Sequence, residues 1–251
     1  TGLTNFIGSG SHRFRYYSDE TNTNYSAVLT SGKYGIYREQ PTLIITADDE
    51  TVTYGTAPTE SVTITGTVNG DNSSTVLTTS ASISIAGDTS TSNNYIVGDH
   101  TITPSAAAST YGYAITYAAG TLTVDQKAVT YSIAAGNITY GDVHSAGAIS
   151  YDGLETGDLV SASAQIDNVS LSTSNKLEAA TYSQSINGAH SGDDVGNYNI
   201  TLDTANNYVV AQKALTIGGI TASNKVYDGD TSATIDVSAA TFTGLVEGDD
   251  V

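Results

Sequence analysis

Apolar and polar residues alternate along most of this chain, in short segments that are separated by turn residues. The segment 61–65, Ser-Val-Thr-Ile-Thr, shows the pattern clearly. Because successive side chains of a β-strand point to opposite faces, this period of two predicts strands with one buried face. The same pattern predicts further strands at 42–46, 51–55, 82–85, 100–104, 113–117 and 120–124.

Helical patterns are scarce. No segment has the apolar spacing of a long amphipathic helix, and 105–110, with its three alanines, is the one candidate for a helical turn. Residues 66–71 form a predicted turn that holds Asn69-Gly70, the strongest short signal for a β-hairpin. The chain is therefore predicted to be all-β.

The sequence also repeats itself. Gln126-Lys127-Ala128-Val129-Thr130 returns 86 residues later as Gln212-Lys213-Ala214-Leu215-Thr216. Tyr54-Gly55 returns as Tyr140-Gly141 and again, with one residue inserted, as Tyr227-Asp228-Gly229. A unit of this length is too long for a solenoid turn and fits a small domain that buries its own core.

The repeat divides the chain into four predicted parts: residues 1–40 as a separate segment, a first repeat at 41–126, a second at 127–212, and the beginning of a third at 213–251. Each repeat is expected to be a small antiparallel β domain, either an immunoglobulin-like sandwich or a β-grasp-like variant. No Gly, Ser or Pro run interrupts 124–129, so neighbouring repeats are expected to be stiffly coupled beads. Tyr54, Tyr140 and Tyr227 are expected to occupy equivalent, largely buried positions.

Residues 1–40 have a different composition from the repeats. They hold all three arginines and two of the three phenylalanines, together with five tyrosines. Alternation at 12–16 and 33–37 predicts two short strands, each with an aromatic face. Such a segment either binds sugar or nucleic acid, or is a cap or junction whose aromatic residues pack on a neighbouring domain.

Charge narrows the choice of partners. The chain has 26 acidic and 8 basic residues and a net charge of −18, which repels phosphate backbones and anionic lipid. No apolar run is long enough to cross a membrane, and any export signal is expected upstream of Thr1. Cysteine and methionine are absent, so there is little to oxidise, which suits an extracellular protein.

No catalytic or cofactor-binding residues can be assigned. His12, His100, His144 and His190 fall at no shared repeat position and lack metal-ligand spacing. Calcium is the one possible cofactor, because short acidic turns supply hard oxygen ligands; the same residues also suit the turn's own backbone hydrogen bonds. These turns are Asp48-Asp49-Glu50, Asp193-Asp194, Asp228-Gly229-Asp230 and Asp249-Asp250.

The repeats resemble two related families. Segments 101–104, 113–117 and 120–124 are similar to the end of the MBG repeat of the YGX type, and Tyr54-Gly55-Thr56 stands where that family places its Tyr-Gly-X. Residues 225–229, with Gly248-Asp249-Asp250-Val251, resemble the YDG repeat, and residues 18–42 resemble the junction that precedes such repeats in filamentous-haemagglutinin-like exoproteins. The second repeat mixes features of both types.

The resemblance implies a secreted, surface-held adhesin of a class in which many members are exported by two-partner secretion, and it transfers no catalytic residue. We therefore expect a non-enzymatic structural stalk of a bacterial adhesin or biofilm-matrix fibre, whose first partners are neighbouring repeats of the same chain. Surface polysaccharide or a host-cell ligand is a further expected partner. The alternatives are a carbohydrate-binding module that uses the tyrosine-rich face of residues 13–37, and an assembly subunit that stacks into filaments.

Overall fold

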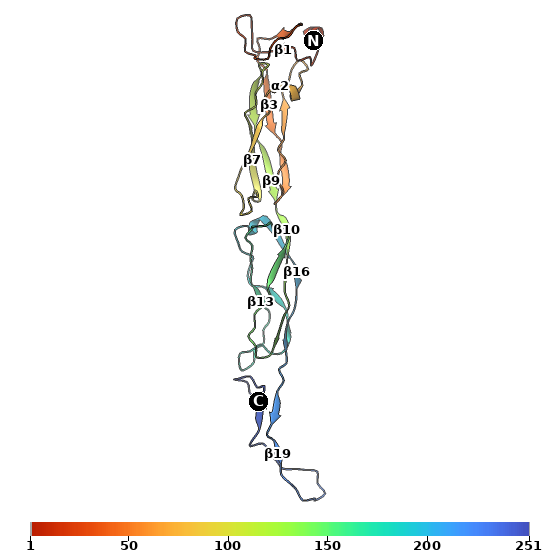
Figure 1. Ribbon diagram of the computed structural model, residues 1–251, viewed down its shortest axis with the longest axis vertical. Helices are drawn as coiled ribbons and strands as arrows, with labels where there is room; N and C mark the ends of the chain where they lie inside the picture. The colour runs from red at the N-terminus through yellow and green to blue at the C-terminus, as the bar shows by residue number, and fades with distance from the viewer. Residues whose placement is uncertain (1, 251) are drawn as a thin grey trace. The chain divides into compact units, whose positions relative to one another are not determined.

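The computed structural model describes residues 2–250 and consists almost wholly of short strands and turns (Figure 1). The all-β prediction is confirmed. Two short α-helices are present, α1 (Gly2–Ile7) and α2 (Ser73–Val76), with one 3-10 turn, η1 (Val195–Asn197). Among the described residues, no helix is long and apolar enough to cross a membrane.

The helical turn expected at 105–110 does not form. Ser105 ends a strand, and the residues after it are irregular. The short helix lies instead at α2, where the Asn72 side chain accepts a hydrogen bond from the Ser74 amide at 2.9 Å. An N-cap of this kind satisfies an amide that the first helical turn leaves free. In the alanine segment, Ala106 has positive φ and Ala108 pairs with Thr79, so a helical turn cannot form there.

The chain divides into two compact units. Unit 1 extends as far as Lys127 and includes Glu155–Leu159 and Asp193–Asn199; unit 2 comprises Ala128–Leu154, Val160–Gly192 and the chain from Ile200 onward. The division does not follow the repeat, because unit 1 takes in two segments of the second repeat. The repeat boundaries at 41–126 and 127–212 stay a prediction.

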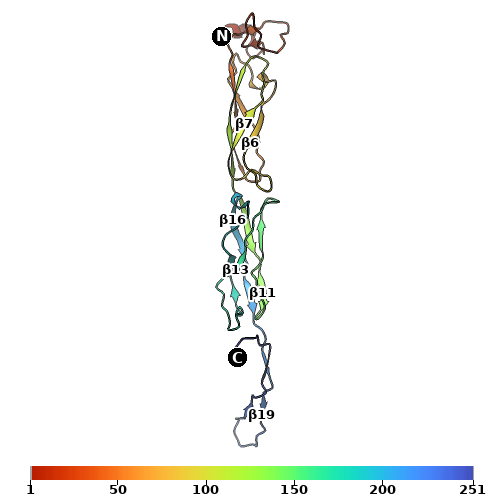
Figure 2. The same ribbon diagram turned by 90° about the vertical axis from the view of Figure 1, so that its left-hand side faces the viewer.

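Unit 1 contains a two-stranded parallel sheet, β1 (Phe14–Arg15) with β2 (Gly35–Ile36), at the two positions predicted for short N-terminal strands. It also contains two larger sheets that share one core, which is a sandwich arrangement (Figures 1 and 2). One sheet has the order β5-β3-β8 and the other β4-β9-β7-β6. The strands are β3 (Thr42–Ala47), β4 (Glu50–Thr53), β5 (Val62–Thr65), β6 (Ser82–Ala86), β7 (Gly98–Ser105), β8 (Ala114–Ala118) and β9 (Gly120–Asp125).

These sheets are mixed rather than wholly antiparallel. The pairs β3–β5, β6–β7 and β7–β9 are antiparallel, whereas β3–β8 and β4–β9 are parallel. Asn69 and Gly70 both have positive φ, as the turn signal requires, but no hairpin results, because β5 pairs with β3 and the chain after the turn enters α2. A local turn signal therefore predicted the turn correctly and its strand pairing wrongly.

The core of unit 1 lies between the sheets. Leu43 and Ile45 of β3 are fully buried, and β3 contacts β7 and β9, which contribute Ile102 and Leu122. Burial alternates along β3, as the sequence pattern predicts, so that Ile44 on the opposite face is 44% exposed. Period two therefore decides which side chains form the core.

Unit 2 repeats much of this topology. Its sheets have the orders β12-β10-β16 and β11-β17-β14, with a separate pair β13-β15. As in unit 1, the pair β10–β12 is antiparallel and the pair β11–β17 is parallel. The strands are β10 (Lys127–Ile133), β11 (Gly136–Thr139), β12 (Ile149–Asp152), β13 (Ala164–Ile166), β14 (Thr181–Tyr182), β15 (Gln184–Ile186), β16 (Tyr198–Ala205) and β17 (Tyr208–Ala211).

The described part of the third repeat forms only two-stranded ribbons, β18–β21 and β19–β20. Their bounds are Thr216–Gly218 and Thr241–Thr243 for the first, and Thr221–Ala222 and Ile235–Asp236 for the second. Tyr227 is 94% exposed there, so its predicted burial is wrong. No second sheet covers this part of the described chain, and a ribbon alone has no interior in which to place the ring.

We predict that Leu43→Ala lowers the free energy of unfolding of unit 1 by about 2–5 kcal/mol, because it leaves a cavity between the two sheets. Ile44→Ala, one residue along the same strand, should cost less than about 1 kcal/mol. Urea denaturation followed by circular dichroism measures both variants. Equal losses for the two would mean that β3 does not bury the face described here.

Candidate functional site

One six-residue turn occurs three times, with glycine first, glycine fifth and aspartate last. The copies are Gly66–Asp71, Gly153–Asp158 and Gly244–Asp249. In each copy both glycines have positive φ, and the aspartate amide donates to the carbonyl of the third residue at 3.0–3.2 Å. Side chains rarely adopt such φ values, so the spacing of the two glycines reflects backbone geometry. We call this the acceptor turn.

In unit 1 the aspartate of the second acceptor turn receives the hydroxyl of Tyr54. The Tyr54 hydroxyl lies 2.5 Å from Asp158 Oδ2 and 2.6 Å from Ser90 Oγ. The Ser92 amide donates to Asp158 Oδ1 at 3.1 Å. Tyr54 is 1% exposed, which agrees with the predicted burial. In this arrangement a tyrosine and nearby serines of one repeat bind the acceptor-turn aspartate of the next. We call it a tyrosine–aspartate clasp.

A second tyrosine completes the clasp in unit 1. Tyr198 also donates its hydroxyl to Asp158 Oδ2, at 2.5 Å, and accepts a hydrogen bond from the Glu155 amide at 2.9 Å. The rings of Tyr54 and Tyr198 meet edge to face, with centroids 5.3 Å apart. Aromatic pairs favour this arrangement, so the two tyrosines support each other as well as the carboxylate.

The electrostatics of this clasp favour a charged aspartate and neutral tyrosines. Burial opposes ionisation of Asp158, but hydrogen bonds from Ser92, Tyr198 and Tyr54 outweigh it and hold the pKa of Asp158 below its ordinary value. Burial, together with the hydrogen bond to Asp158, raises the pKa of both Tyr54 and Tyr198. The hydroxyls therefore remain donors throughout the physiological pH range.

Unit 2 contains the same clasp at the third acceptor turn. Tyr140, equivalent to Tyr54 in the sequence repeat, donates its hydroxyl to Asp249 at 2.6 and 2.7 Å from the two carboxylate oxygens. Ser174 lies 3.4 Å from the same hydroxyl and stands in the sequence Ser-Thr-Ser-Asn, which also surrounds Ser92. Hydrogen bonds from Ser174 and Tyr140 lower the pKa of Asp249. Tyr140 is only half-buried, so it matches its prediction less fully than Tyr54 does.

The glycine after each clasp tyrosine allows a close approach. Gly55 and Gly141 both have positive φ. A Cβ on Gly55 would lie 2.3 Å from Glu155 Oε1, and a Cβ on Gly141 would lie 2.7 Å from a methyl group of Val246. Glu155 and Val246 are the third residues of their acceptor turns, so the turn rests directly on the Tyr-Gly backbone. Glu155 also forms an ion pair with Lys127.

Two further contacts in unit 1 went unnoticed in the sequence. Asp194, 2% exposed, accepts hydrogen bonds from the Thr91 amide and hydroxyl and from the Leu159 amide. Asn197 accepts from the Val97 amide at 3.0 Å. The sequence indicated Asp193-Asp194 only as an acidic turn. The recurrence of Ser-Thr-Ser-Asn at 90–93 and 172–175 is the signal that could have identified Thr91 as the partner of Asp194.

The acidic turns proposed for calcium mostly bind their own neighbourhood. Asp48 accepts from the Ser61 and Thr63 hydroxyls, and these bonds lower its pKa. Asp228 pairs with Lys225, and Asp230 accepts from the Ser232 amide. Within residues 2–250, no three His, Asp or Glu side chains gather as a metal ion would require.

The four histidines do not come together. His12 lies beside Thr75, while His100 is buried and its Nε2 lies 2.7 Å from the Ile96 carbonyl oxygen. His190 contacts the Tyr151 hydroxyl at 2.9 Å, and burial lowers its pKa. His144 is exposed.

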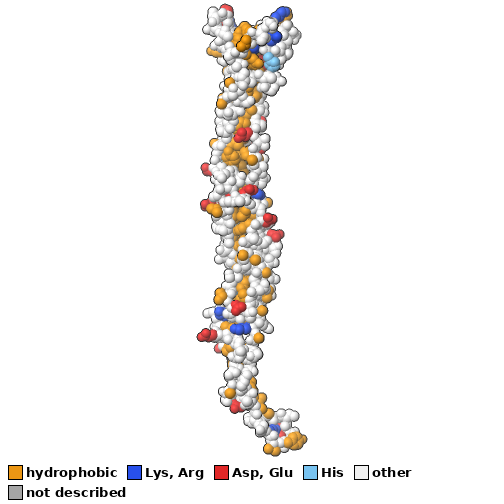
Figure 3. Space-filling view, in the orientation of Figure 1, with side chains coloured by type: hydrophobic (Ala, Val, Ile, Leu, Met, Phe, Trp, Pro, Cys, Tyr) orange, Lys and Arg blue, Asp and Glu red, His pale blue; other side chains and the backbone are white. Residues whose placement is uncertain are grey.

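Arginine side chains lie over several tyrosine rings of the N-terminal segment. Arg15 is 3% exposed, and its guanidinium lies over the rings of Tyr25, Tyr34 and Tyr111 at 4.7–5.7 Å. Figure 3 shows several Lys and Arg side chains at the N-terminal end of the face in view. Each cation–π contact covers one face of a ring, which leaves that face unavailable to stack on a sugar.

We predict that Tyr54→Phe lowers the free energy of unfolding of unit 1 by about 1 kcal/mol, the usual value for a hydroxyl–carboxylate bond that is partly open to water. Tyr95→Phe is the matched control, since the Tyr95 hydroxyl reaches only the Ile85 carbonyl at 3.5 Å. Denaturant titration of both variants measures the difference. If the control lost as much as Tyr54→Phe, the clasp would contribute nothing.

A second prediction concerns pH. Because the folded pKa values of Asp158 and Asp249 are lowered, the clasps stabilise the fold above the unfolded aspartate pKa of about 3.9, and this contribution disappears as pH falls through the folded values. Thermal melts between pH 7 and pH 2 should therefore show melting temperatures that decline below about pH 4. Asp158→Asn should reduce that decline. An unchanged decline in this variant would contradict the assignment.

Parts of these repeats match known protein families. No curated protein and no solved structure matches the chain. Two family models do match, and neither family is known as an enzyme family. Both matches indicate a repeat region of the adhesin type. The two families predicted from the sequence are confirmed: residues 43–123 match the MBG domain (YGX type), and residues 211–251 match the YDG domain.

Proposed function

We propose that these repeats form a non-enzymatic structural stalk of a bacterial adhesin or matrix fibre, secreted and held outside the cell. The observation that carries the proposal is the clasp. Tyr54 and Asp158 are 104 residues apart, and Tyr140 and Asp249 are 109 apart, so each clasp ties one sequence repeat to the next. Neighbouring repeats of the same chain are the partners that these contacts serve.

The connection between repeats supports the same role. A single residue, Gln126, separates β9 from β10. Its side chain donates to the Gly196 carbonyl at 2.9 Å, inside unit 1. A connection this short gives the chain little freedom there, whereas a Gly/Ser linker would behave as a random coil. This contact and the Tyr54 clasp therefore hold segments of two sequence repeats within one compact unit.

Composition fits an exposed fibre. A net charge of −18 keeps neighbouring chains soluble and apart. The absence of cysteine and methionine removes the side chains that oxidise most readily. In this proposal, recognition of surface polysaccharide or of a host ligand belongs to other parts of the protein. The rings of Tyr25 and Tyr34, over which the Arg15 guanidinium lies, give no support to a carbohydrate-binding platform in this segment.

The test uses the whole exported protein. Deleting residues 127–212 should shorten the surface fibre by about 30–50 Å, the length expected of one compact β domain, while ligand binding persists. Electron microscopy of the surface measures the length. A matched variant, in which a Gly/Ser linker of equal length replaces 127–212, should give a broad distribution of end-to-end distances instead of a fixed length.

Two outcomes would contradict the stalk. Loss of ligand binding in a deletion variant that is folded and exported would make the repeats the receptor-reading part. A fixed fibre length in the Gly/Ser variant, equal to that of the original protein, would show that the repeats do not set the spacing. Export and folding are checked by cell-surface labelling and by protease resistance.

A further inference from the structure

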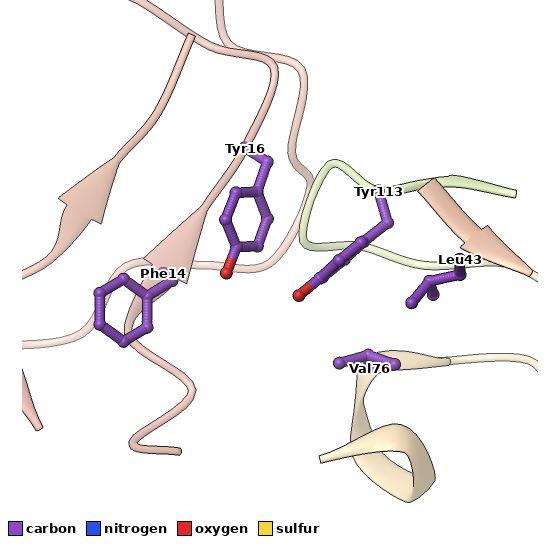
Figure 4. Close-up of a cluster of buried hydrophobic side chains, with 5 residues drawn as sticks. All are labelled: Phe14, Tyr16, Leu43, Val76 and Tyr113. Carbon is purple, nitrogen blue, oxygen red and sulfur yellow. The ribbon is translucent and has the colours of Figure 1, made fainter. Parts of the chain in front are cut away.

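A tyrosine from outside the predicted repeats binds the acceptor turn of the first repeat. Asp71, the last residue of Gly66–Asp71, is 6% exposed and accepts the Tyr16 hydroxyl at 2.8 Å. It also accepts the Tyr113 hydroxyl at 2.9 Å, on the same oxygen. Figure 4 shows the hydroxyls of Tyr16 and Tyr113 turned toward one another beside Leu43 and Val76. All these residues lie in unit 1.

This arrangement reproduces the Tyr54 clasp on the repeat's side. Tyr113 is the sequence equivalent of Tyr198, and each accepts a hydrogen bond from the third residue of its acceptor turn: Val68 donates to Tyr113 at 3.2 Å, and Glu155 donates to Tyr198 at 2.9 Å. The ring centroids of Tyr16 and Tyr113 lie 4.6 Å apart, compared with 5.3 Å for Tyr54 and Tyr198. Tyr16 therefore occupies the position of Tyr54.

The residue after Tyr16 has positive φ, like the glycine of each Tyr-Gly pair. Tyr17 has φ +55°, and Gly55 and Gly141 have φ +86° and +95°. Positive φ is uncommon for a residue with a side chain and costs about 1–2 kcal/mol. In all three cases a residue with positive φ thus directly follows the tyrosine that donates, from an earlier part of the chain, to an acceptor-turn aspartate.

A serine also contacts the first acceptor turn, as serines contact the later ones. A Cβ on Gly70, the fifth residue of the first acceptor turn, would lie 2.0 Å from Ser9 Oγ. The fifth glycines of the later turns meet the clasp serines in the same way: a Cβ on Gly248 would lie 3.3 Å from Ser174 Cβ, and one on Gly157 would lie 4.0 Å from Ser92 Cα. Ser9 thus takes the place of the clasp serine.

We propose that residues 9–17 are a mimic of a preceding repeat, which seals the first acceptor turn with the contacts used between later repeats. The surface that receives it, Gly66–Asp71 with Tyr113, is an interaction site for a tyrosine followed by a left-handed residue and accompanied by a serine. Its occupant here is the chain's own N-terminal segment. The proposal rests on contacts inside unit 1 and is independent of the stalk function.

The mimic is incomplete at one atom. Asp71 Oδ1 is buried and, among the described residues, has no hydrogen-bond partner, whereas Asp158 Oδ1 receives the Ser92 amide. A buried acceptor without a donor is unfavourable. The Tyr16 contact should therefore open more readily than the Tyr54 clasp.

Hydrogen exchange followed by mass spectrometry on the full chain tests the mimic. The amides of Tyr16, Tyr17 and Ser18 are suitable reporters, since each donates to a backbone carbonyl. Tyr16→Phe keeps the ring and removes the donor, so exchange at these amides should rise about tenfold or more, while β3 and β9 keep their protection. Tyr37→Phe is the control, because Tyr37 stacks on Tyr16 at 5.7 Å and its hydroxyl has no partner among the described residues. An effect of Tyr16→Phe no larger than that of Tyr37→Phe would overturn the proposal.

A second pair of variants probes the backbone independently of the hydroxyl. Tyr17→Gly should keep reporter exchange within about threefold of the original chain, because glycine adopts positive φ freely. Tyr17→Val should raise exchange about tenfold or more, since a β-branched residue resists that conformation. Tyr17 is 49% exposed, and an ordinary surface residue of that burial would favour valine over glycine. That reversed order would also overturn the mimic.

Discussion

A carboxylate that two tyrosine hydroxyls share is the interaction on which the rest of this structure depends. Removing a carboxylate from water is costly unless donors surround it, so the buried Asp71 and the half-buried Asp158 each require partners from elsewhere in the chain. Tyrosine suits this task, because one side chain supplies a large apolar ring and a donor at its tip. In each case one of the two tyrosines lies outside the repeat that owns the aspartate. The burial of the aspartate therefore makes each repeat depend on the segment that precedes it.

The backbone of the acceptor turn explains which residues the repeats keep. Between its glycines the three copies read Thr-Val-Asn, Leu-Glu-Thr and Leu-Val-Glu, so side-chain chemistry varies freely there. Both glycines keep positive φ in all three copies. A Cβ on Gly66 would lie 2.1 Å from the carbonyl oxygen of Thr42 in β3, and a Cβ on Gly244 would lie 2.2 Å from that of Ala214. Close backbone approach and left-handed φ thus account for the spacing that the sequence preserves.

Sequence reasoning reached the strands and the repeat more readily than the site. Alternation located β3, β5, β6 and β9, because burial of one sheet face leaves a period of two in the residues themselves. Strand direction could not be read this way, since parallel and antiparallel pairs share that period, and Tyr227 shows that repeat position alone does not decide burial. The clasp joins residues about a hundred positions apart, and no local sequence pattern around either residue identifies the other as its partner. The N-terminal mimic was harder still, because Tyr16-Tyr17 shares a conformation and not a sequence with Tyr54-Gly55.

The clasps also bear on the use of so many acidic residues with so few basic ones. Within the described residues only three ion pairs occur, and two of them join exposed partners. Several aspartates instead accept hydrogen bonds from hydroxyls, as Asp48 does from Ser61 and Thr63 and Asp158 does from Tyr54. Salt screens attraction between exposed charges, whereas hydrogen bonds from hydroxyls at contact distance are screened much less. A fold held by hydroxyl–carboxylate bonds should therefore keep its stability when ionic strength changes and lose it in acid. A fold held by surface ion pairs should lose stability under both conditions.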